Sequence, residues 1–336
     1  MNMKGLYPGL PSGRVFCLVF VLWASVLALG QVQASESSSQ SQEQTAAEAT
    51  KKTRTRVGRK PNRIEDPLRA AVNSKHRTPT YVGRDKARHP YDTLRFFGIQ
   101  PHLTVVELTP GAGWYTEILA PYLRDSGQYI GANYNPESDN AEYRKAAKIL
   151  SKKIAENPEL YGKAKITVFE PPYLSEVAPP ETADMVLTFR NMHNWVSSGP
   201  ETVDTVLANV YKSLKPGGVF GVVDHRLPAD RKFDEHASSG YLPEDYVIEV
   251  IEKAGFVFDA KSEINANPKD TANHPHGVWA LPPTYRNQDM GRERYEAIGE
   301  SDRMTLRFIK PQASDTNSDT SPDTSRDTST GTNSNP

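Results

Sequence analysis

The stretch from residue 104 to residue 115 joins a short apolar run, two glycines and the start of a helix-period pattern. The run at 104–108 predicts a strand buried on both faces. Gly111 and Gly113 follow at once, and from Trp114 apolar residues recur with the spacing of one helix face. Glycines let a backbone approach a ligand closely, and a helix N-terminus offers unpaired N–H groups. This segment therefore predicts the first half of a nucleotide-binding unit.

Strand-like and helix-like segments alternate along the rest of the middle of the chain. Strands are predicted at 103–108, 128–133, 166–169, 184–189, 219–224, 256–264 and 304–309, and helices at 91–97, 114–123, 141–154, 201–214 and 246–254. Alternation of this kind favours an α/β fold with a doubly wound, mostly parallel sheet and helices on both faces. The last two strands are joined by a long connection and are predicted to close the sheet as a pair.

Three stretches resemble class I S-adenosylmethionine-dependent methyltransferases. Residues 107–113 (Glu-Leu-Thr-Pro-Gly-Ala-Gly) resemble the first motif of that family, 210–219 (Val-Tyr-Lys-Ser-Leu-Lys-Pro-Gly-Gly-Val) the turn before its fifth strand, and 250–256 its last helix-to-strand turn. The resemblance spans about residues 91–310. Residues 189–195 and 223–226 are similar to a subgroup of predicted bacterial methyltransferases, many with signal sequences. The resemblance implies a Rossmann-like methyltransferase fold of seven strands, with an antiparallel closing strand and S-adenosylmethionine as cofactor.

The resemblance also assigns cofactor-binding positions, in the loops that follow the first three strands. These are Glu107, Thr109, Gly111, Gly113, Asn133 and Glu170. In the family, the acid and glycines of the first motif hold the methionine end and the ribose, and later acids hold the ribose hydroxyls and lie near the adenine. This chain departs from the pattern because Thr109 replaces the first glycine, Pro110 removes a backbone donor, and Asn133 stands where the family has a carboxylate.

The loop after the fourth predicted strand carries the candidate catalytic residues. It reads Phe-Arg-Asn-Met-His-Asn-Trp over 189–195. His193 is the candidate general base, because a neutral imidazole can take a proton from an acceptor. Asn191 is expected to hold the backbone or the ligand, while Trp195 walls the pocket or packs the loop. Asp224 and His225 end the fifth strand, but adjacent strand residues point to opposite faces, so one of the two is expected to be structural.

The termini differ in kind from the middle. Two basic residues precede an apolar run at 15–29 and a small-residue site ending at Ala34, which predicts a signal peptide over 1–34 and export to the periplasm. An uncleaved inner-membrane anchor is the alternative. Residues 35–62 are predicted to be a disordered basic linker, either a solvated tether or a weak contact with anionic lipid. A methyltransferase-like domain is expected over 63–311 and a disordered Ser/Thr/Asp-rich tail over 312–336.

Composition narrows the chemistry. The single cysteine, Cys17, lies in the apolar run, so a mature chain without it has neither a disulfide nor a cysteine nucleophile. Lys and Arg number 40 against 41 Asp and Glu, so no overall positive charge favours nucleic acid. No metal site is predicted, because His274-Pro-His276 lacks a third ligand. The polar and aromatic connection at 265–301, which carries Trp279, is a candidate lid.

These features favour an enzyme that transfers a methyl group from S-adenosylmethionine to a small-molecule acceptor, such as a hydroxyl. The second hypothesis is an exported, non-catalytic methyltransferase-fold binding module with a degenerate cofactor pocket, and the departures at Thr109, Pro110 and Asn133 favour it. A nicotinamide-dependent oxidoreductase is disfavoured, since Thr116 stands where a dinucleotide fingerprint has its third glycine. The sequence indicates neither the identity of the acceptor nor an oligomeric state.

Overall fold

The computed structural model describes residues 66–312. These residues belong to one compact unit of the chain. The predicted signal peptide at 1–34, the linker at 35–62 and all but the first residue of the predicted tail at 312–336 lie outside the described residues, so the expectations about them stay predictions. Among residues 66–312, no helix combines the length and the apolar composition needed to cross a bilayer.

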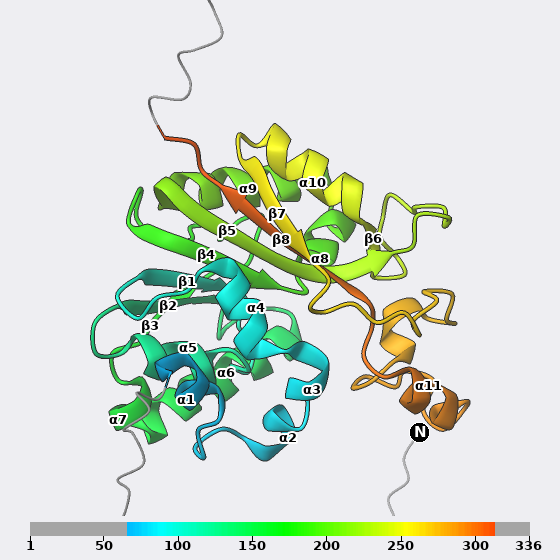
Figure 1. Ribbon diagram of the computed structural model, residues 1–336, viewed down its shortest axis with the longest axis horizontal. Helices are drawn as coiled ribbons and strands as arrows, with labels where there is room; N and C mark the ends of the chain where they lie inside the picture. The colour runs from blue at the N-terminus through cyan, green and yellow to red at the C-terminus, as the bar shows by residue number, and fades with distance from the viewer. Residues whose placement is uncertain (1–65, 313–336) are drawn as a thin grey trace, which may run out of the picture. The chain divides into compact units, whose positions relative to one another are not determined.

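A single twisted sheet organises the described residues (Figure 1). Its strands are β1 (Thr104–Leu108), β2 (Gln128–Asn133), β3 (Lys165–Val168), β4 (Ala183–Phe189), β5 (Leu214–Leu227), β6 (Leu242–Pro243), β7 (Val257–Ser262) and β8 (Arg303–Ile309). The main path runs β3-β2-β1-β4-β5-β8-β7, and the short β6 pairs with β5. Neighbours from β3 to β5 are parallel, whereas β8 is antiparallel to both β5 and β7. The predicted mostly parallel sheet with an antiparallel closing strand is confirmed; its main path has the expected seven strands, and the short β6 is an eighth.

Helices cover both faces of this sheet. They are α1 (Pro67–Val72), α2 (Pro79–Val82), α3 (Asp85–Arg88), α4 (Pro90–Phe97), α5 (Thr116–Leu123), α6 (Ala141–Glu156), α7 (Pro158–Tyr161), α8 (Met192–Ser197), α9 (Pro200–Ser213), α10 (Glu244–Lys253), the 3-10 turn η1 (Gly277–Ala280) and α11 (Arg292–Ile298). One hydrophobic cluster packs α8, α9 and α10 against the sheet, and a second packs α1, α4 and α5. Figure 1 shows α9 and α10 across the sheet from α1 and α5.

The central strands explain why both faces are covered. Val105 of β1 lies in the cluster with α5, while its neighbour Val106 lies in the cluster with α9. Successive side chains of a strand point to opposite faces, so an apolar run without alternation must be buried twice. The short run at 104–108 predicted this burial, and both valines are fully buried.

Some element boundaries differ from the sequence expectations. Residues 111–115 form turns, so the helix expected from Trp114 begins at Thr116 as α5. The strand expected at 219–224 begins at Leu214, which pairs with Ala183 before an irregularity in the register. Helices α1, α2, α3 and α8 were not predicted, because segments of four to six residues are too short to display a helical period.

Candidate functional site

A hollow of about 380 Å³ lies beyond the carboxyl ends of β1, β4 and β5. The glycine turn at 109–113 forms one wall, the loop after β4 a second, and part of the connection between β7 and β8 a third. Strands β1 and β4 are neighbours, but the helices that follow them, α5 and α8, pack on opposite faces. The sheet therefore changes its winding direction here, which is where open α/β sheets bind ligands.

The glycine turn presents bare backbone to the hollow. Thr109, Gly111 and Gly113 have φ of 52°, 60° and 88°, a region that favours glycine. A Cβ on Gly113 would lie 2.8 Å from Leu150 Cδ1, so packing against α6 requires glycine there. A Cβ on Gly111 would have no atom within 4 Å, because this residue faces open space. A ligand can therefore approach the backbone at Gly111 without meeting a side chain.

Asn133 holds this turn from the next strand. Its Oδ1 accepts the N–H of Gly111 at 3.0 Å, and its Nδ2 donates to the C=O of Gly111 at 3.1 Å. The side chain is buried and does not line the hollow. The amide is thus committed to the backbone of the turn, and direct contact between Asn133 and a cofactor stays a prediction.

Glu170 also lies outside the wall of the hollow. Its Oε1 accepts Ser138 Oγ–H at 2.6 Å, and its Oε2 accepts the backbone N–H of Asn135 at 3.2 Å. Glu170 therefore fixes the loop after β2. From that loop Tyr134 lines the hollow and stacks on Tyr143, with ring centroids 4.0 Å apart. Tyr134 directly follows the second predicted strand, and this position alone would have indicated a place near the hollow.

Glu107 lies at the floor of the hollow and is 3% exposed. Its Oε2 accepts hydrogen bonds from Tyr129 Oη at 2.7 Å and Thr116 Oγ1 at 3.3 Å. Burial raises the pKa of Glu107 to about 7, although both hydrogen bonds lower it. The carboxyl therefore changes its charge near neutral pH, and a cation in the hollow would favour the ionised form.

His193 pairs with Asp224 across two elements. His193 Nδ1 lies 2.8 Å from Asp224 Oδ1, and the backbone N–H of His193 donates to Asp224 Oδ2 at 3.2 Å. Asp224 is fully buried. In the tautomer that carries the proton on Nδ1, the ring donates to Asp224, and this hydrogen bond fixes its orientation. Nε2 then has a free lone pair and, within the described part of the chain, no hydrogen-bond partner. This geometry suits a general base, a role that stays a prediction for His193.

Asp224 therefore pairs with the ring of His193 and not with the ring of the adjacent His225. Asp224 accepts the backbone N–H of His225, but the imidazole of His225 instead contacts Ser301 Oγ at 2.6 Å through Nδ1. Burial, followed by His193 and nearby arginines, lowers the pKa of His225 well below its usual value. His225 is therefore neutral at physiological pH, and its uncharged ring lines the hollow.

His193, Asp224 and His225 bring potential metal-ligating atoms within 4.8 Å of one another. The electrostatic surroundings oppose a metal ion there. Arg190, Arg303 and Arg88 are all close enough to lower the pKa of His225, and the same positive potential repels a divalent cation. The sequence expectation of no metal stays a prediction.

Asn191 joins the ends of two strands. Its Nδ2 donates to the C=O of Leu108 in β1 and to Thr188 Oγ1 in β4, both at 3.1 Å. These two hydrogen bonds hold the end of β1 and the loop after β4 together. Asn191 also lines the hollow. Trp195, by contrast, packs in the core, with its ring centroid 6.2 Å from that of Phe169. It does not line the hollow.

The connection between β7 and β8 forms the outer wall through Val278, Trp279 and Pro282. The ring centroid of Trp279 lies 6.2 Å from that of His193, as a candidate lid residue requires. His274 plays another part: it is buried, and its Nε2 lies 2.7 Å from Asp270 Oδ1. Asp270 also accepts hydrogen bonds from Tyr241 Oη and from the backbone of Asp302.

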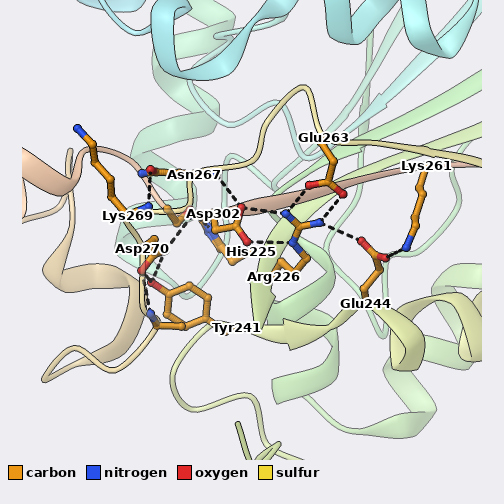
Figure 2. A network of polar contacts seen from close by, with 12 residues as sticks. His225, Arg226, Tyr241, Glu244, Lys261, Glu263, Asn267, Lys269, Asp270 and Asp302 are labelled. Atoms are coloured by element: carbon orange, nitrogen blue, oxygen red, sulfur yellow. Dashed lines mark hydrogen bonds and ion pairs between the residues drawn. The ribbon is translucent and has the colours of Figure 1, made fainter. Parts of the chain in front are cut away.

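Figure 2 shows how this connection is attached to the sheet. The guanidinium of Arg226, near the end of β5, binds Asp302 at 2.9 Å, Glu263 at 2.7 Å and Glu244 at 3.3 Å. Hydrogen bonds to Glu263 are the largest of the causes that raise the pKa of Arg226. The two ends of the connection, one at Glu263 and the other at Asp302, are therefore held by the same cation.

Three arginines that the sequence analysis did not single out also line the hollow. They are Arg84, Arg88 and Arg190, with Glu300 beside them. Arg190 follows β4 directly, so its place after a predicted strand was a usable signal. Arg84 and Arg88 belong to the segment of α2 and α3, whose short helices gave no pattern in the sequence.

No protein-family model and no curated protein matches this chain. Solved structures with similar folds include a methyltransferase dependent on S-adenosylmethionine from Aquifex aeolicus, with 15% identity, a TM-score of 0.45 and coverage of 73% of this chain and 98% of that one. A putative sarcosine dimethylglycine methyltransferase from Galdieria sulphuraria has 13% identity, a TM-score of 0.46 and coverage of 70% and 90%. An arsenic(III) S-adenosylmethionine methyltransferase from Chlamydomonas reinhardtii has 16% identity, a TM-score of 0.43 and coverage of 74% of both chains. Identities and TM-scores this low support no conclusion about activity. The fold is assigned from the order and register of the strands.

Proposed function

We propose that this protein is a methyltransferase that binds S-adenosylmethionine in the hollow and transfers its methyl group to a small-molecule acceptor. The observation that carries the proposal is the turn at Gly111, which has a positive φ and open space where a Cβ would lie. Glu107 lines the same hollow, and its carboxylate would favour the positive charge of a sulfonium nucleoside held by this turn. Transfer would then proceed by direct displacement at the methyl carbon, with positioning of the two reactants as the main catalytic effect.

His193 is the proposed base for an acceptor such as a hydroxyl. Asp224 orients the ring through Nδ1, which leaves Nε2 to take the acceptor proton as the methyl carbon is attacked. Trp279 and Pro282 close the outer side of the hollow, and their apolar surfaces would exclude water that could compete with the acceptor.

Calorimetry on the full chain tests the proposal with a matched pair of variants. In Gly111→Ala the added methyl enters the hollow, so we expect S-adenosylmethionine binding to be lost or weakened at least about tenfold, a change of about 1.4 kcal/mol. In Gly98→Ala, at the end of α4, the backbone also has a positive φ (82°) and the Cβ also meets no atom within 4 Å, but the site is not in the wall of the hollow. This control carries the same kind of backbone strain and should bind normally.

The second candidate function is a non-catalytic binding module. Asn133 supports it, because both polar atoms of its amide are committed to Gly111 and no carboxylate stands at the expected ribose position. Failure of S-adenosylmethionine to bind the wild-type chain would favour this candidate and contradict the enzyme. Binding of NADH without S-adenosylmethionine would instead favour an oxidoreductase.

We further propose that the chain is exported to the periplasm through a cleaved signal peptide ending at Ala34. Three features of residues 1–34 support this: the two basic residues, the apolar run that follows them, and the small-residue site at its end. A C-terminal fusion to a reporter active only outside the cytoplasm should be active, and the mature N-terminus should begin at Ser35. An active reporter on a chain that still begins at Met1 would indicate an inner-membrane anchor.

A further inference from the structure

Four arginines from three separate segments meet in or beside the wall of the hollow. Arg84 and Arg88 come from the segment at α3, Arg190 follows β4, and Arg303 begins β8. A single carboxylate, that of Glu300, lies among them and binds Arg84 at 2.6 Å, Arg88 at 3.1 Å and Arg303 at 3.3 Å. We call these five residues the arginine cluster.

The cluster has more positive charge than its own acid neutralises. Arg88 and Arg303 are 4% and 3% exposed, and burying a cation without a counter-charge is costly. Burial, followed by repulsion from Arg190 and attraction to Glu300, leaves the pKa of Arg88 at about 9. Burial is also the first cause that lowers the pKa of Arg190 to about 10. The other nearby carboxylate, Asp224, is committed to His193.

Several guanidinium donors of the cluster have no acceptor in the described part of the chain. Arg84 Nη2, Arg88 Nη2 and Arg303 Nε are buried and have no hydrogen-bond partner there. The side chain of Arg190 makes no hydrogen bond to any of residues 66–312, although its backbone N–H donates to the C=O of Val223 at 2.7 Å. Buried donors of this kind normally have partners, so the cluster has room for an acceptor that residues 66–312 do not supply.

Arg190 reaches the hollow from a strained backbone. Its φ is 64°, a region where a residue with a Cβ costs on the order of 1–2 kcal/mol. Glycine would relieve that strain but would remove the guanidinium from the wall of the hollow. Backbone strain is often retained at functional residues. The strain at Arg190, whose guanidinium makes no hydrogen bond to residues 66–312, therefore indicates a functional side chain.

We propose that the arginine cluster binds a carboxylate or phosphate group of the methyl acceptor. This inference rests on the proposed function, since it assumes that the glycine turn holds the cofactor. The planar fork of Arg190 suits two-point binding of either anion, while Arg84 and Arg88 offer the unpaired Nη2 donors. An acceptor anchored there would extend toward His193 and His225, which line the same hollow. The acceptor is therefore an anionic small molecule.

The first experiment measures binding of small anions to the full chain by calorimetry at low ionic strength. Benzoate and inorganic phosphate are the anionic probes, and benzamide is the neutral match for benzoate. We expect saturable binding of at least one anion, no binding of benzamide, and at least about tenfold weaker anion binding in Arg190→Gln. Arg231→Gln, at an exposed arginine outside the hollow, should leave the affinity unchanged. No anion binding, or equal binding by both variants, would overturn the proposal.

Arg190→Lys covers the case in which Arg190→Gln does not fold. This variant keeps the charge but loses the fork, so benzoate affinity should fall while phosphate affinity is partly retained. Equal affinity of Arg190→Lys and the wild type for benzoate would contradict two-point binding by Arg190.

The second experiment identifies the source of the anion, because the cofactor also carries a carboxylate. Anion binding is measured again with saturating S-adenosylhomocysteine. Retained benzoate or phosphate binding assigns the cluster to the acceptor. Competition, together with weaker S-adenosylhomocysteine binding in Arg190→Gln, would assign it to the cofactor and overturn the acceptor assignment. Cofactor binding without anion binding leaves the methyltransferase proposal standing, whereas anion binding without cofactor binding removes that proposal and keeps the anion site.

Discussion

At the scale of single residues, the strained positions of the hollow follow its two central strands. Thr109 comes directly after β1 and Arg190 directly after β4, with φ of 52° and 64°. Both residues carry a Cβ where glycine would be less strained. Because β1 and β4 are adjacent and parallel, the two strained turns lie at the same edge of the sheet. Their conformations aim the glycine turn and a guanidinium into one space.

The charge of Glu107 makes a prediction about pH. Its pKa of about 7 in the unliganded protein means that a cationic cofactor must bind with loss of a proton below that pH. We expect the affinity for S-adenosylmethionine to rise about tenfold between pH 5.5 and 7.5 and then to level off. Calorimetry across this range measures the effect.

Glu107→Gln provides the control, since it preserves the shape of the side chain and removes the titration. Its affinity should be low and nearly independent of pH. A wild-type profile that is flat, or that falls with rising pH, would contradict a cation beside Glu107.

At the scale of elements, the hollow depends on how the strand ends are held together. Helix α8 begins after Asn191, whose amide bridges Leu108 at the end of β1 and Thr188 in β4. The neighbouring side chain of Asn194 also lines the hollow but makes no hydrogen bond to any of residues 66–312. Comparing variants of the two asparagines therefore distinguishes the effect of the hydrogen-bond bridge from the effect of changing a residue in the wall.

Asn191→Ala should lower the free energy of unfolding by about 1–3 kcal/mol, because the C=O of Leu108 and the hydroxyl of Thr188 lose a buried partner. Asn194→Ala should change it by less than about 0.5 kcal/mol. Urea unfolding of both variants measures the difference. Equal and small effects would show that the bridge contributes nothing to holding β1 and β4 together.

At the scale of the whole molecule, Glu300 joins segments far apart in the sequence. It lies just before β8, at the end of the long connection, and binds Arg84 and Arg88 near the start of the described chain. Burial opposes its charge, but the surrounding arginines hold the pKa of Glu300 at about 2. Together with Arg226, which binds both ends of the connection (Figure 2), Glu300 fixes the outer wall of the hollow to the rest of the domain.

The depressed pKa of Glu300 predicts a loss of stability in acid. A carboxyl with a folded pKa of about 2 and an unfolded value of about 4.5 stabilises the fold fully above pH 4.5. That contribution, about 3 kcal/mol, is lost as the pH falls toward 2. Glu300→Gln should be less stable than the wild type at pH 6, and the difference should shrink toward pH 3. Glu296→Gln, which breaks an exposed pair with Arg292, should show little change. A difference for Glu300→Gln that does not vary with pH would contradict this account.

Local patterns in the sequence are enough to predict the sheet and the edge at which the site lies. The apolar run of β1, the glycines after it and the helix periods of α6, α9 and α10 are local patterns, because burial on one or two faces repeats with the period of the element. Parallel strands bring their carboxyl ends to one edge, so the loops with Gly111, Asn191 and His193 were expected to meet, and all three line the hollow.

The pairing of side chains in the site, in contrast, depends on how the elements pack. Asp224 pairs with His193, which lies 31 residues away, and not with the imidazole of its neighbour His225. Asn133 turned out to be committed to Gly111, and the arginine cluster gathers residues from α3, β8 and the loop after β4. Sequence periodicity fixes the face on which a side chain lies, but the distance between side chains of different elements depends on how those elements pack. That packing is set by all the residues of the core together, so no local pattern records it.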